Sequence, residues 1–307
     1  MMIASPPIQY LKRREIDTRK WDDCIGRAPN GRVYAYSFYL DAMADDWDAL
    51  VIGDYTHVMP LPWRSKWGIR YLYQPFLVAQ GGLFGPAISP DLLAAFIGKI
   101  PPRFRYIDIC LNSGNPAPAA GAEWNLRNNY VLPLHNTYEE ISAGYRENCR
   151  RNIRKAILSG VTVHTDFNPE EVAALALPVL QKDDRQAGLT LERFKKLYGL
   201  LKEKQQAMTW GIRMGGKLMA SCVFFFSHGR AYYILVGNHP NGKTMGASHT
   251  LIDAFIKAHA GSGLLLDFEG SDIRNLAFFY SGFGAVQELY PALRQNRLPF
   301  WLRWLKK

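Results

Sequence analysis

The chain has 307 residues, of which 48% are hydrophobic and 13% aromatic, and it carries a formal net charge of +10. This apolar content excludes a disordered chain, and the length favours about two domains of roughly 150 residues each. The basic excess suits an anionic partner such as a nucleotide, a tRNA, an acidic glycan precursor or a membrane surface, although ordinary solubility explains the charge equally well.

The spacing of cysteines, short catalytic motifs and apolar runs further limits the class of protein to which the chain can belong. The four cysteines lie far apart without paired spacing, which predicts free thiols in a reducing compartment and no metal site. No H-E-x-x-H or G-x-S-x-G motif occurs, so neither a zinc hydrolase nor a serine esterase is indicated. No apolar run approaches the roughly 20 residues of a membrane span, and the N-terminus has no signal-type apolar core. We therefore expect a cytoplasmic protein.

The first half of the chain alternates helical and strand patterns. It predicts two helices, a hairpin, a strand, a helix and a strand, over residues 16–25, 37–44, 49–61, 71–77, 90–99 and 106–111. A basic, aromatic turn at 63–68 follows the hairpin, and a loop rich in Asn, Ser, Gly, Pro and Ala covers 112–122. We place the domain boundary next to the strand at 130–134, which predicts domains 1–129 and 130–307.

The second half opens with a long predicted helix at 138–159 that contains the run RENCRRNIRKA. Arg150, Arg154 and Lys155 belong to a basic set whose spacings of three and four place several members on one face. A solvated helix face would explain this set, but we favour contact with an anion because Glu147 is the one acid in the run. A strand at 161–166, helices at 169–186 and 191–206, and a three-stranded meander at 209–236 are predicted to follow.

The meander leads into a glycine-bearing stretch with two interpretations. Residues 237–244, GNHPNGKT, match G-x-x-x-x-G-K-T and precede a predicted helix at 245–260. This is the local context of a phosphate-binding P-loop, in which exposed N–H groups and the positive end of a helix hold phosphates. Against a P-loop NTPase, the preceding strands are hairpins and few residues follow.

A short buried strand ends in acid and glycine near the C-terminus. The sequence GLLLDFEG at 263–270 predicts this strand, and residues 273–280 have helical spacing before a glycine stop at 282–284. Polar groups at such a strand end lie at an open edge of a sheet, where ligands of α/β proteins bind.

The strand end Asp267-Phe268-Glu269-Gly270, followed by a short helix and by FYSGFG at 279–284, resembles the C-terminal signature of the Fem-type transferases, relatives of the GNAT acyltransferase superfamily. The basic helix at 138–159 extends this resemblance over the C-terminal half. It implies an α/β (α+β) fold of tandem GNAT-like domains, each a mixed, mostly antiparallel sheet flanked by helices. Tyr280 stands where the Fem pattern has a lysine, which weakens the case for a peptidoglycan-precursor acceptor.

The resemblance also implies ligands and the residues that hold them. Fem enzymes take amino acids from aminoacyl-tRNA and add them to a peptidoglycan precursor, whereas other GNAT relatives use acyl-CoA, so the donor stays open between the two. In GNAT proteins the glycine loop before the helix holds the CoA pyrophosphate, and the positions assigned to this role here are Gly242, Lys243, Thr244, Gly246 and Ala247. Phe279 and Tyr280, with Arg150, Arg154 and Lys155, are the expected substrate-binding residues.

Amide formation needs a base that takes a proton from the amine. Glu269 is the first candidate, and Asp267, one strand repeat earlier, would share its face, so repulsion between them would raise one pKa. Helix capping or pairing with Arg274 would explain both acids equally well.

We therefore predict an N-acyltransferase of the GNAT/Fem type that moves an acyl or aminoacyl group to a small-molecule or peptide amine in cell-envelope or peptidoglycan metabolism, with no metal. The alternatives are a P-loop-like nucleotide-binding protein and a catalytically inactive binding module. A tRNA partner and a peripheral membrane contact through the basic, aromatic end at 297–307 are consistent with the charge, although that end could also pack on the core. No stable DNA complex is expected.

Overall fold

The structure is a computed structural model that describes residues 7–117, 123–181 and 187–302. By compactness the chain divides into unit 1, Met1–Arg127 with Leu289–Lys307, and unit 2, Asn128–Glu288. The predicted boundary at 129/130 lies beside the first limit of these units. The second limit returns residues 289–307 to unit 1, which the sequence did not indicate. Within the described ranges, every helix is too short or too polar to span a bilayer.

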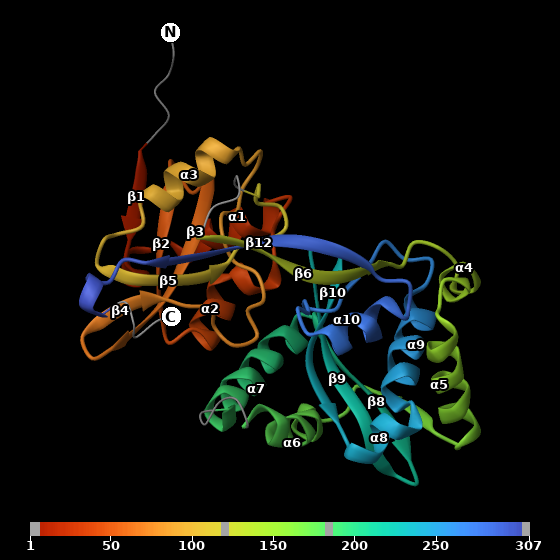
Figure 1. Ribbon diagram of the computed structural model, residues 1–307. Helices are drawn as coiled ribbons and strands as arrows, with labels where there is room; N and C mark the ends of the chain where they lie inside the picture. The colour runs from red at the N-terminus through yellow and green to blue at the C-terminus, as the bar shows by residue number, and fades with distance from the viewer. Residues whose placement is uncertain (1–6, 118–122, 182–186, 303–307) are drawn as a thin grey trace. The chain divides into compact units, whose positions relative to one another are not determined.

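Unit 1 is a mixed sheet with helices on both faces (Figure 1). Its elements are β1 (Ile8–Leu11), α1 (Thr18–Arg27), α2 (Ser37–Met43), β2 (Asp46–Ile52), β3 (His57–Lys66), β4 (Ile69–Leu72), α3 (Pro90–Gly98) and β5 (Phe104–Cys110). The strand order is β1-β2-β3-β4-β5, followed by the end of β12 (Val286–Asn296), and only the β4–β5 pair is parallel.

Strand β2 shows how the sequence builds the two faces of unit 1. Leu50 and Ile52 join the cluster that contains Phe96 of α3, whereas Trp47 and Ala49 join the cluster around α1. Successive strand residues point to opposite faces, so an apolar run can fill a core on each side of the sheet.

Unit 2 is built in the same way. Its elements are β6 (Trp124–Pro133), α4 (Tyr138–Ala143), α5 (Glu147–Leu158), β7 (Thr162–Thr165), α6 (Pro169–Leu180), α7 (Ala187–Glu203), β8 (Ala207–Met214), β9 (Lys217–Ser227), β10 (Arg230–Asn238), α8 (Pro240–Met245), α9 (Ala247–His259), β11 (Leu265–Asp267), α10 (Arg274–Ser281) and the start of β12. The strand order is β6-β11-β10-β9-β8-β7, with only β10–β11 parallel. Phe224 of β9 stacks on Phe255 of α9, whereas its neighbour Phe225 stacks on Phe194 of α7, so helices cover both faces here too (Figure 1).

Local patterns predicted most of these elements. The β8–β9–β10 meander is confirmed, and the residues of its two turns have the positive φ that hairpin turns demand: Gly215, Gly216, His228 and Gly229. The single helix predicted at 138–159 is wrong, because α4 ends before Gly144 and α5 starts after Arg146. At this break the Arg146 N–H donates to the Gly282 carbonyl (2.9 Å), and Tyr145 packs edge-on against Phe283. A contact distant in sequence therefore divides the helix.

Candidate functional site

The sheet of unit 2 opens between β10 and β11. The two strands pair only between residues 230–232 and 265–267, while β10 runs on to Asn238 with β9 as its partner. A β-bulge between Tyr233 and Leu235 lies where the pairing with β11 stops. Bulges are frequent next to active sites, and ligands of open α/β sheets bind beyond the carboxyl ends of strands. The end of β11 is therefore the candidate site.

Asp267, the last residue of β11, is held by three donors. Its side chain is 1% exposed. Oδ1 accepts from Asn129 Nδ2 (2.9 Å) and from the Glu269 N–H (3.0 Å), and Oδ2 accepts from Arg230 Nη1 (2.8 Å). Arg230, rather than Arg274, therefore supplies the opposite charge to Asp267.

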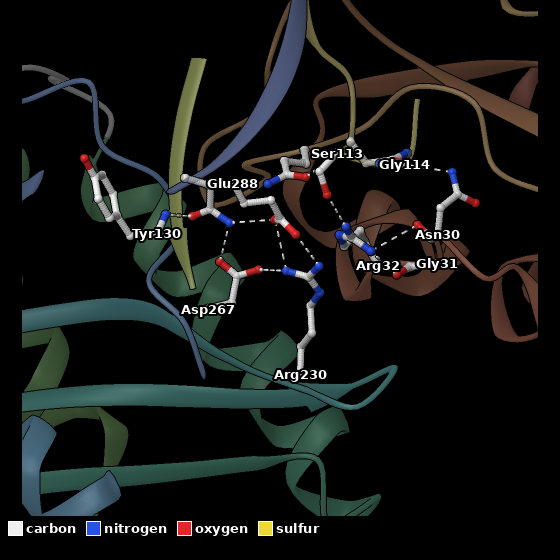
Figure 2. A network of polar contacts seen from close by, with 12 residues as sticks. Asn30, Gly31, Arg32, Ser113, Gly114, Tyr130, Arg230, Asp267 and Glu288 are labelled. Atoms are coloured by element: carbon white, nitrogen blue, oxygen red, sulfur yellow. Dashed lines mark hydrogen bonds and ion pairs between the residues drawn. The ribbon is translucent and has the colours of Figure 1, made fainter. Parts of the chain in front are cut away.

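Figure 2 shows Arg230 between the carboxylates of Asp267 and Glu288. Its Nη2 donates to Glu288 Oε1 (2.7 Å), and Asn129 Nδ2 reaches Glu288 Oε2 (3.2 Å). Burial alone would lower the pKa of Arg230, but the hydrogen bond to Glu288 and the charges of both carboxylates raise it. Sequence reasoning missed Arg230, Glu288 and Asn129, because only strand pairing brings these residues to β11.

Glu269 follows the strand in a backbone conformation that glycine usually adopts. Its φ is 67°, and its side chain is half-buried. The Asn129 side chain holds the turn, since its Oδ1 accepts from the Gly270 N–H (2.6 Å). A non-glycine residue in this region costs about 1–3 kcal/mol, and such strain concentrates at functional sites. The Asp267 and Asn129 contacts thus fix where Glu269 leaves the strand.

An aromatic cluster from α10 lies beside this turn. Tyr280 is 7% exposed and stacks on Phe268 at a ring-centroid distance of 4.5 Å. Burial, and next the nearby charge of Glu269, raise the pKa of Tyr280. Phe279 packs against His249 of α9 (4.7 Å), and burial lowers the pKa of this histidine to about 4. The structure therefore brings the predicted Glu269 and Tyr280 together, with Phe279 next to them.

The predicted cofactor-binding glycines have packing roles. Gly242 is buried, and a Cβ there would lie 2.1 Å from the Met219 carbonyl oxygen. Gly246 has a φ of +78°, and its Cβ would lie 2.3 Å from the Asn152 carbonyl oxygen. Ala247 is fully buried. These positions let β9 and α5 approach the backbone closely.

The remaining two predicted cofactor-binding positions, Lys243 and Thr244, lie in helix α8. Thr244 is exposed; its hydroxyl donates to the Asn241 carbonyl, and its own carbonyl accepts from Lys155 Nζ (2.9 Å each). Lys243 is helical, and its side chain lies outside the described residues. Because residues 240–245 form helix α8, the G-x-x-x-x-G-K-T letters do not make the glycine-rich loop of a P-loop NTPase.

The predicted substrate-binding basic residues of α5 contact different parts of unit 2. Arg150 Nη2 donates to the carbonyls of Ser142 (3.2 Å) and Ala143 (2.8 Å) at the end of α4, whereas Lys155 reaches α8. Arg150 and Arg154 line a pocket of about 550 Å³ that also exposes part of the buried Asp253. The Tyr138 hydroxyl donates to that carboxylate (2.9 Å). These two arginines thus share one pocket, while Lys155 does not line it.

No group of three or more His, Cys, Asp or Glu side chains that could hold a metal ion is found in the ranges that the structure describes.

A family model matches most of unit 2. Residues 143–272 match the family model described as Acetyltransferase (GNAT) domain. This match includes α5, the β8–β10 meander, α9 and the β11 turn with Glu269. No sequence match to a curated protein is found.

Solved structures resemble nearly the whole chain. A crystal structure of FemX aligns with a TM-score of 0.64 at 13% identity, covering 97% of this chain and 99% of that one. A Bacteroides thetaiotaomicron protein of unknown function gives 0.57 at 12% identity, over 94% and 100%. A tandem GNAT protein from the clavulanic acid biosynthesis pathway gives 0.54 at 12% identity, over 95% and 99%. At these identities the likeness shows the fold: the chain is folded like FemX and like a tandem GNAT protein.

Proposed function

Because residues 143–272 match a GNAT domain and the chain shares its fold with FemX, we propose that it is an N-acyltransferase acting on an amine. The acyl or aminoacyl donor is acyl-CoA or aminoacyl-tRNA, and the Fem-like relatives favour an acceptor in cell-envelope or peptidoglycan metabolism, a small molecule or a peptide.

The position of Glu269 at the end of β11 is the observation that supports this proposal most directly. Its carboxylate follows the end of β11, where the strand pairing with β10 has ended, and its backbone is held in the left-handed region by contacts to Asp267 and Asn129. A base must lie at a fixed position to take a proton from an attacking amine. Asp267 is enclosed by three donors, so we assign it the positioning role and Glu269 the role of base.

The reaction joins the amine nitrogen to the acyl carbon. The C–S bond of a thioester donor, or the C–O bond of an aminoacyl ester, breaks, and the leaving thiolate or alkoxide takes up a proton. Glu269 removes the proton that the amine loses. Negative charge develops on the acyl oxygen during attack, and backbone N–H groups of β10 beyond Tyr232, where β11 no longer pairs, are suited to stabilise it.

A transfer assay tests the base. Purified protein is supplied with labelled acetyl-CoA or a charged tRNA pool, together with small amines and a peptidoglycan-precursor peptide. Glu269→Gln should lower kcat/KM at least about 100-fold with an unchanged melting temperature, because a general base contributes about 10²–10⁴-fold. Glu203→Gln, at an exposed position of α7, is the matched control and should keep wild-type activity.

The same assay separates an enzyme from a binding module. Wild-type turnover in Glu269→Gln would refute this residue as the base. Stabilisation of the fold by a donor, without transfer to any acceptor in the panel, would support the inactive binding module instead.

A further inference from the structure

Topology gathers the ends of several strands at one edge of unit 1. In the ladder, Asp46 of β2 pairs with Trp63, Lys66 of β3 pairs with Ile69, and Arg70 of β4 pairs with Phe104. β1 ends toward the same side, since the Arg13 N–H donates to Asp48 Oδ1 (3.1 Å). β12 also ends there, because the Arg297 N–H donates to the Arg105 carbonyl (2.9 Å). Figure 1 shows the ends of β12 and β1 and the β3–β4 hairpin on one side of unit 1. We call this the basic aromatic edge.

Large aromatic side chains project into solvent from the basic aromatic edge. Trp67, at the tip of the β3–β4 hairpin, is 78% exposed, and Lys66 Nζ lies 4.8 Å from its ring centroid. Phe300 and Trp301, which follow β12, are 79% and 60% exposed. The amphipathic end predicted at 297–307 thus contributes two aromatic residues, while its positions 303–307 lie outside the described residues. Exposed tryptophan beside basic residues is typical of the interface between membrane and water.

Basic side chains outnumber acidic ones at this edge. Three cations are matched by acids: Arg13 by Asp41 (2.6 Å), Arg64 by Asp45 (2.6 Å) and Arg103 by Asp48 (2.8 Å). Among the described residues, no ion pair is found for five further cations, namely Lys12, Lys66, Arg70, Lys99 and Arg105. Further acids here are Asp46, which borders the same pocket as Asp48, Glu15, which lies 4.0 Å from Arg14, and Glu123, which accepts from Gln295. A positive excess remains, and it faces outward.

A pocket of about 380 Å³ opens among these cations. Lys12, Arg13, Arg14, Arg70 and Arg103 line it, together with Asp46, Asp48 and Trp63. Asp48 is almost fully buried, where it also accepts from Tyr10, so its charge is enclosed. The buried Arg103 Nε has no hydrogen-bond partner in the described structure. Guanidinium donors in such a concave site suit a phosphate group.

We propose that the basic aromatic edge binds an anionic membrane surface, with Trp67, Phe300 and Trp301 in the headgroup region and a lipid phosphate in the pocket. The aromatic residues favour a membrane over RNA, because Trp67 at a hairpin tip and the adjacent pair Phe300 and Trp301 after β12 project into solvent, as membrane-interface anchors do. Base-stacking platforms for RNA instead line a groove. This binding does not depend on the proposed acyl transfer, so each can fail without the other.

Vesicle sedimentation with the full chain tests the charges. Binding to vesicles of equal parts phosphatidylglycerol and phosphatidylcholine should exceed binding to pure phosphatidylcholine. The triple variant Lys12→Glu/Lys66→Glu/Arg70→Glu should weaken binding about 100-fold or more, at about fivefold for each cation removed. The matched control for total charge is Arg151→Glu/Lys196→Glu/Lys217→Glu in unit 2, which should bind within a few-fold of wild type.

A second variant set tests the aromatic residues. Trp67→Ala/Phe300→Ala/Trp301→Ala should weaken vesicle binding about tenfold or more through lost apolar contact. Its control removes exposed aliphatic side chains from unit 2, as Ile157→Ala/Leu158→Ala/Leu189→Ala. Equal losses in edge and control variants, or equal binding to both vesicle types, would overturn the proposal.

A labelling experiment covers the case in which a triple variant does not fold. All four native cysteines are buried, so Trp67→Cys offers a single exposed thiol for an environment-sensitive fluorophore. Anionic vesicles should shift its emission to the blue, and a Leu158→Cys label in unit 2 should not respond. An unchanged Trp67→Cys signal would contradict the proposal. Tight binding to a duplex RNA without binding to vesicles would reassign the edge to nucleic acid.

Discussion

Replacing Arg230 with methionine would keep the bulk of the side chain and remove its charge between Asp267 and Glu288. The three side chains are 12%, 1% and 21% exposed, so water screens the ion pairs weakly. Removing one partner of a buried pair costs about 3–5 kcal/mol, because the remaining charge is left uncompensated. Asn129 and the Glu269 N–H still donate to Asp267, so we expect the lower end of this range, a loss of about 3 kcal/mol in the free energy of unfolding. For a domain of this size that corresponds to a melting temperature lower by about 6–12 °C.

The effect of pH on Arg230→Met should have a definite sign. Without the guanidinium, Asp267 and Glu288 are two carboxylates that both contact Asn129 Nδ2, and their repulsion favours proton uptake in the folded state. A folded state that binds more protons than the unfolded state gains stability as pH falls. The loss caused by the substitution should therefore be smaller at pH 5 than at pH 7.

Urea unfolding of wild type and variant at both pH values measures the two effects. Arg213→Met is the matched control: it breaks the ion pair with Glu171, in which the side chains are 20% and 41% exposed, and should cost less than about 1 kcal/mol. Arg230→Lys, which keeps the charge, should recover part of the lost stability. The network would not hold β11 if Arg230→Met lowered the free energy of unfolding no more than the control does. A loss that grows at low pH would contradict it as well.

Two further predictions concern packing and titration in unit 2. Gly246→Ala should destabilise the protein by about 2–4 kcal/mol in urea unfolding, because Gly246 has a positive φ and lies close to the Asn152 carbonyl. Its control is Gly199→Ala in α7, where the added Cβ meets open space, so this substitution should be neutral or slightly stabilising. Equal effects of the two substitutions would refute the close approach of α5 to Gly246. Burial lowers the pKa of His249 from 6.5 to about 4 in the folded protein. As pH falls from 6.5 to 4, the unfolded state therefore takes up the proton before the folded state does, and the folded state loses stability. We expect a loss of about 2 kcal/mol, which allows for the partial exposure of the ring. His249→Phe keeps the contact with Phe279 and should remove this part of the pH dependence; an unchanged pH profile would exclude His249 as its source.

Strand β12 illustrates what local patterns fail to predict. Its eleven residues, VQELYPALRQN, include a central proline and charged positions, which are poor strand signals. The strand forms because its second half pairs with β5 from Ala292 to Asn296. β1 was missed for a related reason, since four residues become a strand only against β2.

The sequence by itself determined the features that depend on neighbouring residues. Nearly continuous apolar runs, buried on both faces, made β8, β9 and β10, and residues with positive φ closed their turns. The run from Leu264 to Gly270 predicted a buried strand with Glu269 at its end, and this too is confirmed. These choices are local, because periodicity and turn chemistry act over a few residues.

Only the tertiary structure decided which residues meet across the chain. Arg230 reaches Asp267 because β10 and β11 pair in parallel. Gly242 of the G-x-x-x-x-G-K-T stretch packs closely on β9, and Gly246 just after the stretch packs closely on α5. The same holds for the basic aromatic edge, whose members come from the ends of six strands, β1 to β5 and β12. An ion pair or a close backbone approach depends on distances that strand pairing sets, and such pairing joins residues whose separation in sequence carries no local signal.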